Sequence, residues 1–440
     1  MRVAVVMPMS PESAVADVMI QAIPDLKIRW DIDVWCPTEA KHRLCPAPIK
    51  PFASATNDVR NALAEYELVV YILDDSPLCA SILNLALVLP GLVVLHDASL
   101  TTMIRSAAVE TGTLDELVAR VTAVSGADQA EILRDPDRTG GPEGWLRFCA
   151  EVPLSDVAIE GSLGVVVHSM WHAQQVDGLT LGDVTVAPVP VPSARLGFDV
   201  GETDEPSRLL ADLPDDAVLV VSIETVNAGR QIGVLLRAMA DADVLGRRVH
   251  LLAVGPFDDQ TSTDLLRLAQ SLGLEDRFAV TGNADLSSLR KFVARADILA
   301  VLRDPVLDGQ SASLLTQLLS GKPVIVYDHA HYSELPDDVA VKVDPLDATA
   351  GVRQALRLLV DDEGERERRG ECARDYVLRS RSGTAYAAAL FEAGELALAA
   401  KPRLYLGTDL GERLRRLGLD REEAVVDAVT ALAFDLFDLA

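Results

Sequence analysis

The stretch DPVLDGQSASLLTQLLSGKPVIV, residues 304–326, contains the side chains with the clearest chemical potential in this chain. A carboxylate at Asp308 and hydroxyls at Ser311 and Ser313 stand where a helix is predicted to begin. The first backbone N–H groups of a helix have no partner within it, and the dipole is positive at that end, so such a position attracts anions. The pattern therefore predicts a seat for an anion such as phosphate, although an ordinary strand–helix–strand crossover has the same pattern.

Three further positions carry side chains suited to the same chemistry. Arg230 ends the loop SIETVNAGR, residues 222–230, and its planar guanidinium suits phosphate oxygens, although a surface arginine at a helix start is the alternative. His96 and Asp97 stand at the carboxyl end of a predicted strand, where a substrate would lie. The alternatives are a satisfied core histidine for His96 and a helix cap for Asp97. Ser311 and Ser313 also suit N-capping, which is compatible with ligand binding.

The remaining histidines give weaker signals. His168 precedes Ser169, which can cap a helix that begins near Met170. The spacing of the other histidines relative to carboxylates matches no metal-ligand pattern, so the sequence predicts no metal site. These other histidines are His172, His329 and His331.

Composition limits the classes of function. A chain of 440 residues with 49% hydrophobic residues is expected to form two domains. A net charge of -27 argues against nucleic acid and against stable association with an anionic membrane. The longest apolar stretch, residues 82–95, is broken by Asn84 and by Pro90-Gly91, so it does not predict a membrane span. Five cysteines without metal or disulfide spacing, and no signal-peptide layout, predict a cytoplasmic protein.

Short β-branched runs alternate with helical patterns in both halves, which predicts parallel sheets covered by helices on both faces. We expect an N-terminal α/β domain over 1–195 with a helical insertion over 100–160, a second α/β domain over 205–380, and a helical tail over 381–440. A proline-rich linker begins at Pro188. The predicted strands are 3–7, 34–36, 68–73, 92–96, 165–168 and 184–186, then 218–223, 250–254, 278–280, 298–302, 324–327 and 339–343.

The tail has two parts. Residues 384–400 are expected to cross back to the N-terminal domain, and residues 412–439 form an amphipathic pattern suited to self-packing, to a homo-oligomer or to a hetero-oligomer. Neither half has a G-x-G-x-x-G turn after its first strand, which argues against a nicotinamide cofactor. Ligands of doubly wound sheets bind beyond the carboxyl ends of the strands, so two such domains would bind substrates in a shared cleft.

Several phrases, in order and spacing, resemble the GT-B-fold glycosyltransferases of the retaining, nucleotide-sugar-dependent, group-1-like class. The resemblance extends to about residue 380 and implies two doubly wound, Rossmann-like domains that face a cleft. The phrases are PMSPESAVAD at 8–17, LHDASL at 95–100, VHSMWH at 167–172, SIETVNAGR at 222–230, ADILAVLR at 296–303 and YSELPDDVAVKV at 332–343.

The resemblance implies the transfer of a hexose from a nucleoside diphosphate sugar to an unknown acceptor, with retention of configuration and without a metal or other cofactor. It assigns catalytic roles to His96, Asp97 and Asp308. The implied substrate-binding residues are Ser13, Ala14, Arg230, Gly309, Gln310, Ser311, Ala312, Ser313 and Thr316.

Three residues depart from the family pattern. Ala14 and Glu224 replace glycines of the two phosphate-facing loops, and Thr316 replaces the second glutamate of a Glu-x7-Glu pattern whose first position is Asp308. These departures favour an alternative, a degenerate and non-catalytic partner protein. Another nucleotide-sugar enzyme of the same fold, such as an epimerase, is a third interpretation.

Overall fold

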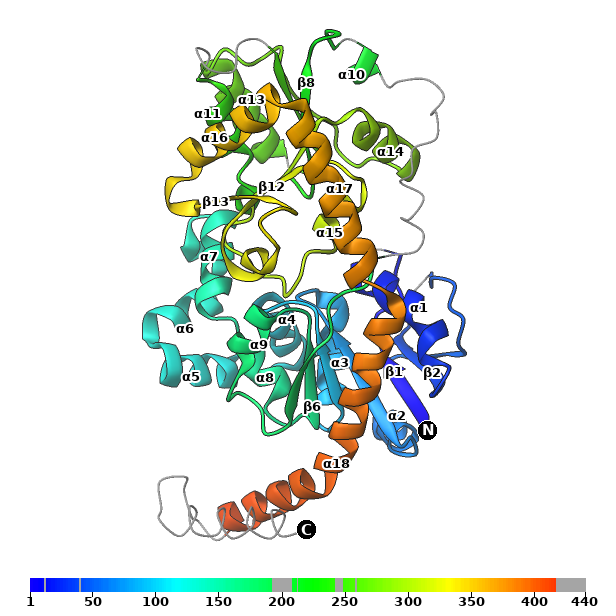
Figure 1. Ribbon diagram of the computed structural model, residues 1–440. Coiled ribbons are helices and arrows are strands. Elements are labelled where there is room, and N and C mark those ends of the chain that lie inside the picture. Colours follow the sequence, from blue (N-terminus) through cyan, green and yellow to red (C-terminus); the bar gives the residue numbers. More distant parts are fainter. Residues whose placement is uncertain are drawn as a thin grey trace.

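The computed structural model describes residues 1–11, 13–38, 41–191, 208–211, 213–241, 248–257 and 259–416. Its described strands form two sheets, and every pairing of neighbouring strands is parallel (Figure 1). Helices flank both sheets. The expected α/β architecture with two doubly wound sheets is confirmed. We call the half built on the first sheet the N-domain and the half built on the second the C-domain.

The N-domain sheet has the strand order β3-β2-β1-β4-β5-β6-β7. All six residues of β4 are buried, as expected for a parallel sheet covered on both faces. The strands are β1 (Arg2–Val6), β2 (Asp31–Pro37), β3 (Ile49–Phe52), β4 (Leu68–Leu73), β5 (Leu92–Leu95), β6 (Gly164–Val167) and β7 (Asp183–Val186).

The N-domain helices include five in succession between β5 and β6, where the helical insertion was expected. Within this insertion, Pro142 is the first residue of α7. Proline suits the first position of a helix, where its missing N–H costs nothing. The helices are α1 (Ala14–Leu26), α2 (Asn57–Ala64), α3 (Ala80–Ala86), α4 (Thr101–Thr111), α5 (Leu114–Ser125), α6 (Ala127–Arg134), α7 (Pro142–Glu151), α8 (Ser155–Ile159) and α9 (Met170–Val176).

The C-domain sheet has the order β10-β9-β8-β11-β12-β13. Its strands are β8 (Val218–Ile223), β9 (Val249–Val254), β10 (Phe278–Val280), β11 (Ile298–Val301), β12 (Val324–Tyr327) and β13 (Val341–Val343). The helices after the linker are α10 (Arg208–Ala211), α11 (Ile232–Met239), α13 (Asp259–Ser271), α14 (Leu286–Arg295), α15 (Ala312–Leu319), α16 (Ala348–Asp361), α17 (Glu363–Ser380) and α18 (Gly383–Arg416).

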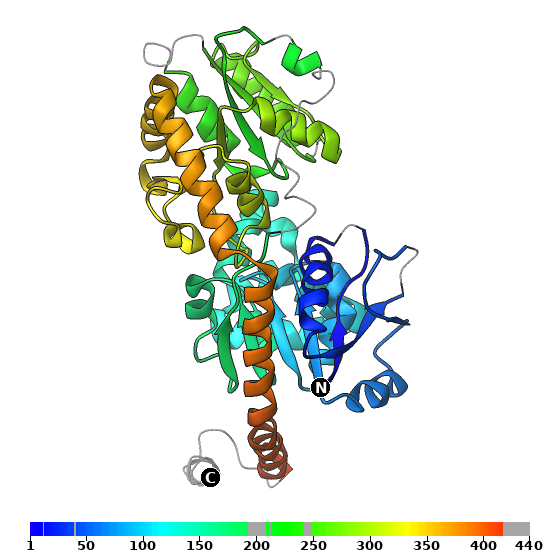
Figure 2. The ribbon, with the colours of Figure 1, turned by 45° about the vertical axis from the view of Figure 1, so that its right-hand side comes forward.

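Helix α18 returns to the N-domain, while α17 packs on α15 and α16 of the C-domain (Figure 2). The Phe391 ring meets Trp30 edge to face at 5.2 Å between ring centroids. A Cβ at Gly394 would lie 2.9 Å from Cζ2 of Trp30, so glycine permits this close packing. The amphipathic element expected over 412–439 falls mostly outside the described residues. In the part of the chain that the structure describes, no helix combines the length and apolarity of a membrane span.

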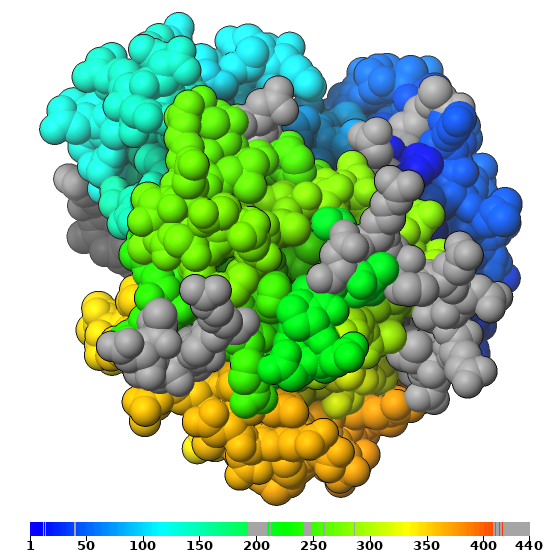
Figure 3. Space-filling model, turned by 90° about the horizontal axis from the view of Figure 1, so that it is seen from above, coloured from blue at the N-terminus to red at the C-terminus, as the bar shows by residue number. Residues whose placement is uncertain are grey.

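The two domains lie against each other. Seen from above in Figure 3, the C-domain in green, yellow and orange covers the N-domain, whose helical insertion in cyan and N-terminal strands in blue extend beyond it. The strand ends of both domains meet at the junction, where the backbones of residues 96–98 and 307–309 are hydrogen-bonded to each other.

Candidate active site

The C-domain sheet reverses its strand order between β8 and β11. These two strands are paired in the sheet, but β8 leads to β9 on one side and β11 leads to β12 on the other. Such a switch point opens a crevice beyond the carboxyl ends of the strands, where ligands of this architecture bind. Glu224 directly follows β8, and Arg303 follows β11 by two residues, so both side chains lie at the switch point.

Helix α15 begins at the same place. Ser311 is its N-cap, and its hydroxyl accepts a hydrogen bond from the Leu314 N–H at 3.1 Å, as expected from the sequence. The Ser313 hydroxyl lies 3.1 Å from the Ser311 hydroxyl, and Ala312 is the first helical residue. The positive end of the helix therefore faces the strand ends.

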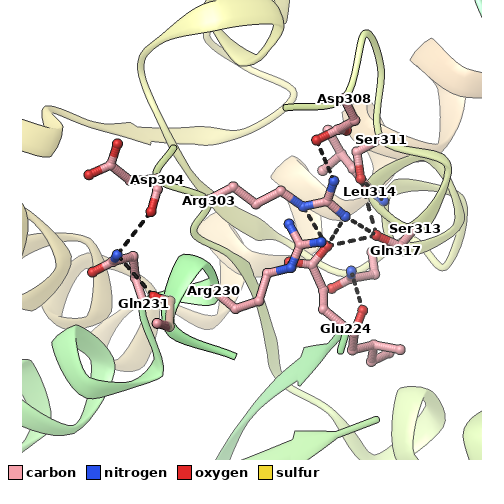
Figure 4. A network of polar contacts seen from close by, with 12 residues as sticks. Glu224, Arg230, Gln231, Arg303, Asp304, Asp308, Ser311, Ser313, Leu314 and Gln317 are labelled. Carbon is pink, nitrogen blue, oxygen red and sulfur yellow. Dashed lines mark hydrogen bonds and ion pairs between the residues drawn. The ribbon is translucent and has the colours of Figure 1, made fainter. Parts of the chain in front are cut away.

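A network of charged groups fills the switch point (Figure 4). Nε of Arg303 donates to Oε1 of Glu224 at 2.8 Å, and Nη2 donates to the same oxygen. The Ser313 hydroxyl also donates to Oε1, at 2.9 Å. The other side of the Arg303 guanidinium pairs through Nη1 with Oδ1 of Asp308 at 2.6 Å. One arginine thus joins two carboxylates that come from separate loops.

Arg230 faces this network from the short turn Ala228–Arg230. Its Nε lies 3.6 Å from Oε2 of Glu224, and among the described residues neither of these two buried atoms has a hydrogen-bond partner. The Arg230 side chain is 24% exposed, compared with 2% for Glu224. Arg230 is therefore the more accessible member of this pair.

Both carboxylates of the network remain ionised. Burial raises the pKa of Glu224, but the nearby guanidiniums of Arg303 and Arg230 more than offset this, so its pKa is lowered. Burial likewise opposes ionisation of Asp308, yet Arg303 and His331 hold its pKa well below the usual range. The Asp308 side chain keeps 17% of its surface exposed, so it combines charge with access to solvent.

Asp97 lies at the junction as well, at the end of β5. It pairs with Asp308 in an isolated antiparallel bridge, and its Oδ2 accepts a hydrogen bond from the Asp75 N–H at 2.7 Å. Burial, together with the neighbouring carboxylates of Asp74 and Asp75, raises the pKa of Asp97 well above its usual range. The helix-capping alternative for Asp97 is wrong, because Asp75 instead accepts from the Met103 N–H in the first turn of α4.

His96 is buried beside His168, with 4.3 Å between the ring centroids. The ring is thus in the core, but its Nε2 has no hydrogen-bond partner among the described residues. Burial and then the neighbouring imidazoles of His168 and His172 lower the pKa of His96 well below its usual value, which keeps the ring neutral. The His96 carbonyl accepts from the Gly309 N–H at 2.8 Å.

Ser169 and Gln310 join the domains through further hydrogen bonds. Ser169 caps α9, as expected, by accepting from the His172 N–H at 3.1 Å, and it donates to the Gly309 carbonyl at 2.7 Å. The Gln310 side-chain oxygen accepts from the Val189 N–H at 2.8 Å. These bonds hold the start of α15 against the N-domain.

Gly309 lies where no other residue fits, because an added Cβ would stand 2.1 Å from Nδ1 of the buried His172. We expect Gly309→Ala to lower the free energy of unfolding by about 1–3 kcal/mol, the usual cost of overpacking. Thermal and urea unfolding measure this loss. Gly161→Ala is the matched control, since an added Cβ there meets nothing within 4 Å. If the cost persists when His172 is also replaced by alanine, the clash is not its cause.

The remaining predicted residues lie on α15 and at the start of α1. Ser13 is the buried N-cap of α1 and accepts from the Ala16 N–H at 3.3 Å, and Ala14 begins that helix. Both follow β1, which lies at the switch point of the N-domain sheet between β2 and β4. Thr316 is buried, and its hydroxyl donates to the Ala312 carbonyl within α15 at 3.0 Å.

Sequence reasoning gave no role to Arg303, His331 or Glu334, which the structure places at the site. Nε2 of His331 lies 3.3 Å from Oδ2 of Asp308. Glu334 accepts from the Met170 and Trp171 N–H groups, at 3.2 and 2.6 Å, and so holds the start of α9 from the opposite domain. Arg303 could have been identified from the sequence as a charged residue just beyond a buried strand. Across the described ranges, no three His, Cys, Asp or Glu side chains are grouped to hold a metal ion.

Comparison with known proteins agrees with this architecture. Residues 218–361 match the family model described as glycosyl transferases group 1. No curated protein matches the sequence of the chain. The matched residues cover the C-domain sheet and the start of α15, so the similarity to this family lies in the C-domain.

Several solved structures share the fold of this chain. Sucrose-phosphate synthase from Thermosynechococcus elongatus superposes with a TM-score of 0.59 at 17% identity, over 91% of this chain and 99% of that one. A glycosyltransferase from Rickettsia africae superposes with a TM-score of 0.61 at 14% identity, over 90% of this chain and 98% of that one. Anabaena Alr3699/HepE, in complex with UDP and glucose, superposes with a TM-score of 0.56 at 12% identity, over 89% of this chain and 98% of that one. The fold is therefore GT-B, and together with the matched domain it supports a glycosyltransferase.

Proposed function

We propose that this chain transfers a sugar from a nucleoside diphosphate sugar to an acceptor with retention of configuration, and that it needs no metal ion. The observation that carries the proposal is the convergence at one switch point of Arg230, the start of α15 and the Asp308 carboxylate, with Asp97 of the other domain beside them. A family match over the same residues supports it.

The phosphate end of the donor would lie between Arg230 and the start of α15. The bond to the sugar breaks as the diphosphate leaves, so negative charge grows on the phosphate oxygens. A guanidinium and the positive end of a helix stabilise that charge, which is the role that a metal ion has in other transferases. The Ser311 and Ser313 hydroxyls lie close enough to each other to bind neighbouring oxygens.

The sugar end would lie at the junction, between Asp308 and the turn of His96 and Asp97. The ionised Asp308 carboxylate suits a hydrogen bond from a sugar hydroxyl, whereas the raised pKa of Asp97 favours a protonated group that can donate one. Two carboxyl groups in unlike protonation states can thus fix the orientation of a sugar. Free cysteines at 36, 45, 79, 149 and 372 suit a reducing compartment, so we place the reaction in the cytoplasm.

A binding screen followed by a turnover assay tests the proposal. We expect at least one of UDP, GDP, ADP and dTDP to bind in calorimetry, and the sugar conjugate of that nucleotide to be hydrolysed slowly without acceptor. UDP-glucose is the first donor to try, because the Anabaena protein of the same fold was solved with UDP and glucose. A chelator should leave the rate unchanged. A folded protein that binds none of these nucleotides and hydrolyses none of their glucose conjugates would contradict the proposal.

Replacement of Arg230 by alanine is expected to weaken nucleotide binding by about 1.5–3 kcal/mol, the usual value of hydrogen bonds to a charged group. The loss should appear for the diphosphate and not for the free nucleoside, because only the diphosphate contacts the guanidinium. Arg267→Ala is the control, since Arg267 lies on α13 with its side chain 71% exposed. Undiminished affinity of Arg230→Ala in calorimetry would end this assignment.

A further inference from the structure

The groups that would bind a donor phosphate in the proposed function surround the Glu224 carboxylate in this structure. Its Oε1 accepts from Nε of Arg303 at 2.8 Å and from the Ser313 hydroxyl at 2.9 Å, and its Oε2 lies 3.6 Å from Nε of Arg230. Two guanidiniums and a hydroxyl from the first turn of a helix are the donors that bind phosphate oxygens. The protein thus supplies an anion of its own to this seat (Figure 4).

The main chain at Glu224 is fixed, so only its side chain can leave the seat. The Glu224 N–H donates to the Val254 carbonyl at 3.0 Å. A Cβ at Gly255 would lie 2.0 Å from the Glu224 carbonyl oxygen, which shows how closely the loop after β9 packs against it. Rotation about the side-chain bonds of Glu224 is therefore the available movement.

The charges around the Glu224 carboxylate are balanced. The guanidiniums of Arg230 and Arg303 oppose the carboxylates of Glu224 and Asp308, and the Arg303 side chain is only 9% exposed. A diphosphate would add at least two negative charges to this neutral group. Like charges a few ångströms apart repel strongly in a poorly hydrated site, so a phosphate and the Glu224 carboxylate disfavour each other there.

The carboxylate nevertheless fits the seat incompletely. Among the described residues, Oε2 of Glu224 and Nε of Arg230 are both buried without a hydrogen-bond partner. A buried polar group without a partner costs free energy that a better-fitting ligand recovers. A phosphate offers more oxygens than a carboxylate, and so it can bind Arg230 and Ser313 together.

We propose that Glu224 is a built-in competitor for the donor, and that a nucleoside diphosphate binds by displacing its carboxylate from Ser313 and Arg230. This inference rests on the proposed function, since it concerns the phosphate seat of that site. The competition lowers donor affinity and makes occupancy of the site depend on donor concentration. Glu224 thus sets the affinity of the site for the donor, and it takes no part in bond breaking.

Glu224→Gln and Glu224→Gly test the competition, with UDP and inorganic pyrophosphate as ligands in calorimetry. Glutamine keeps an oxygen to accept from Arg303 but removes the charge, and glycine removes the side chain. We expect both variants to bind UDP and pyrophosphate at least about tenfold more tightly than the wild type, which is 1.4 kcal/mol. Asp264→Asn, which makes the same change in net charge on the exposed face of α13, should leave both affinities unchanged.

Every other outcome contradicts the inference. Calorimetry with uridine, which has no phosphate, shows whether a change in affinity arises at the phosphate seat. If wild type and Glu224→Gln bind UDP equally well, Glu224 does not compete, although the proposed function stands. If uridine gains as much as UDP, the substitution acts on the base and not on the phosphate seat. If no folded variant binds UDP or pyrophosphate, both the inference and the phosphate seat itself are wrong. Circular dichroism and thermal unfolding establish folding, and glutamine is the variant that preserves the most contacts.

Discussion

Replacement of Arg303 by methionine is expected to lower the free energy of unfolding by about 3–5 kcal/mol, the largest effect of any single substitution that we propose. The guanidinium pairs with Glu224 and Asp308 and donates to the Ser313 hydroxyl at 3.0 Å, with only 9% of its side chain exposed. Removing it leaves two buried carboxylates without their main cation. Urea unfolding at pH 7.5 measures the loss.

The loss should shrink as the pH falls. In the wild type the folded-state pKa values of Glu224 and Asp308 are lowered, so their stabilising contribution is present above the unfolded values and is lost only as the pH falls through the folded ones. Without Arg303, burial dominates and raises the pKa values of both carboxylates. The variant therefore loses stability at neutral pH, and this loss becomes smaller near pH 4. The difference between wild type and variant is therefore largest at neutral pH.

Two controls accompany Arg303→Met. Adding Glu224→Gln and Asp308→Asn should recover most of the loss, because no buried carboxylate is then left unpaired. The charge that remains in the network is that of Arg230, whose side chain is 24% exposed. Arg267→Met breaks an exposed pair with Asp264 at 3.5 Å and should leave stability nearly unchanged. A loss that is independent of pH and unaffected by the added substitutions would attribute the effect to packing and not to charge.

Asp308→Asn is expected to lower kcat by about a hundredfold while changing nucleotide affinity much less. In the proposed reaction the carboxylate accepts from a sugar hydroxyl, and this hydrogen bond strengthens as positive charge develops on the sugar in the transition state. The nucleotide does not make that contact. Single-turnover kinetics with the best donor, together with calorimetry of the nucleotide, separate the two effects.

Asp304→Asn is the matched control for Asp308→Asn, because it removes a carboxylate from the same loop that points away from the network in Figure 4. Equal rates for wild type and Asp308→Asn would remove Asp308 from the active site. A wild type that binds nucleotide but transfers and hydrolyses nothing alone would instead favour the non-catalytic interpretation. The thermal midpoint of Asp308→Asn must also be measured, since the substitution breaks an ion pair with Arg303 at 2.6 Å.

Much of the fold could be predicted from local patterns. The apolar runs at Leu68–Leu73 and Val324–Tyr327 are strands, because side chains buried on both faces of a parallel sheet leave no polar alternation. Strand β3 was missed, since Ile49–Phe52 has four residues and contains Pro51. Such a sequence is tolerated at a sheet edge, which is where β3 lies, but it carries little β signal.

The site could be predicted only in part. The N-cap role of Ser311 followed from its place before a leucine-rich helix, which is a local property. The pairing of Glu224 with Arg303 joins residues that are 79 positions apart, and it depends on β8 lying beside β11 in the sheet. No local pattern reveals which strands are neighbours. The position of Glu224 could be identified as a departure from the family, but its partner could not.

The two chain segments near the border between the domains lie side by side. The chain leaves β7 through residues 187–191, and it passes from α17 to α18 at Arg381, whose carbonyl accepts from the Val191 N–H at 3.0 Å. Only non-covalent contacts hold the domains together where Asp97 meets Asp308 and where Glu334 meets α9. Val191 and Arg381 therefore hold these two segments together at one side of the border between the domains. A rotation of one domain against the other about these two segments would separate the contacts between the domains most where they lie farthest from the segments.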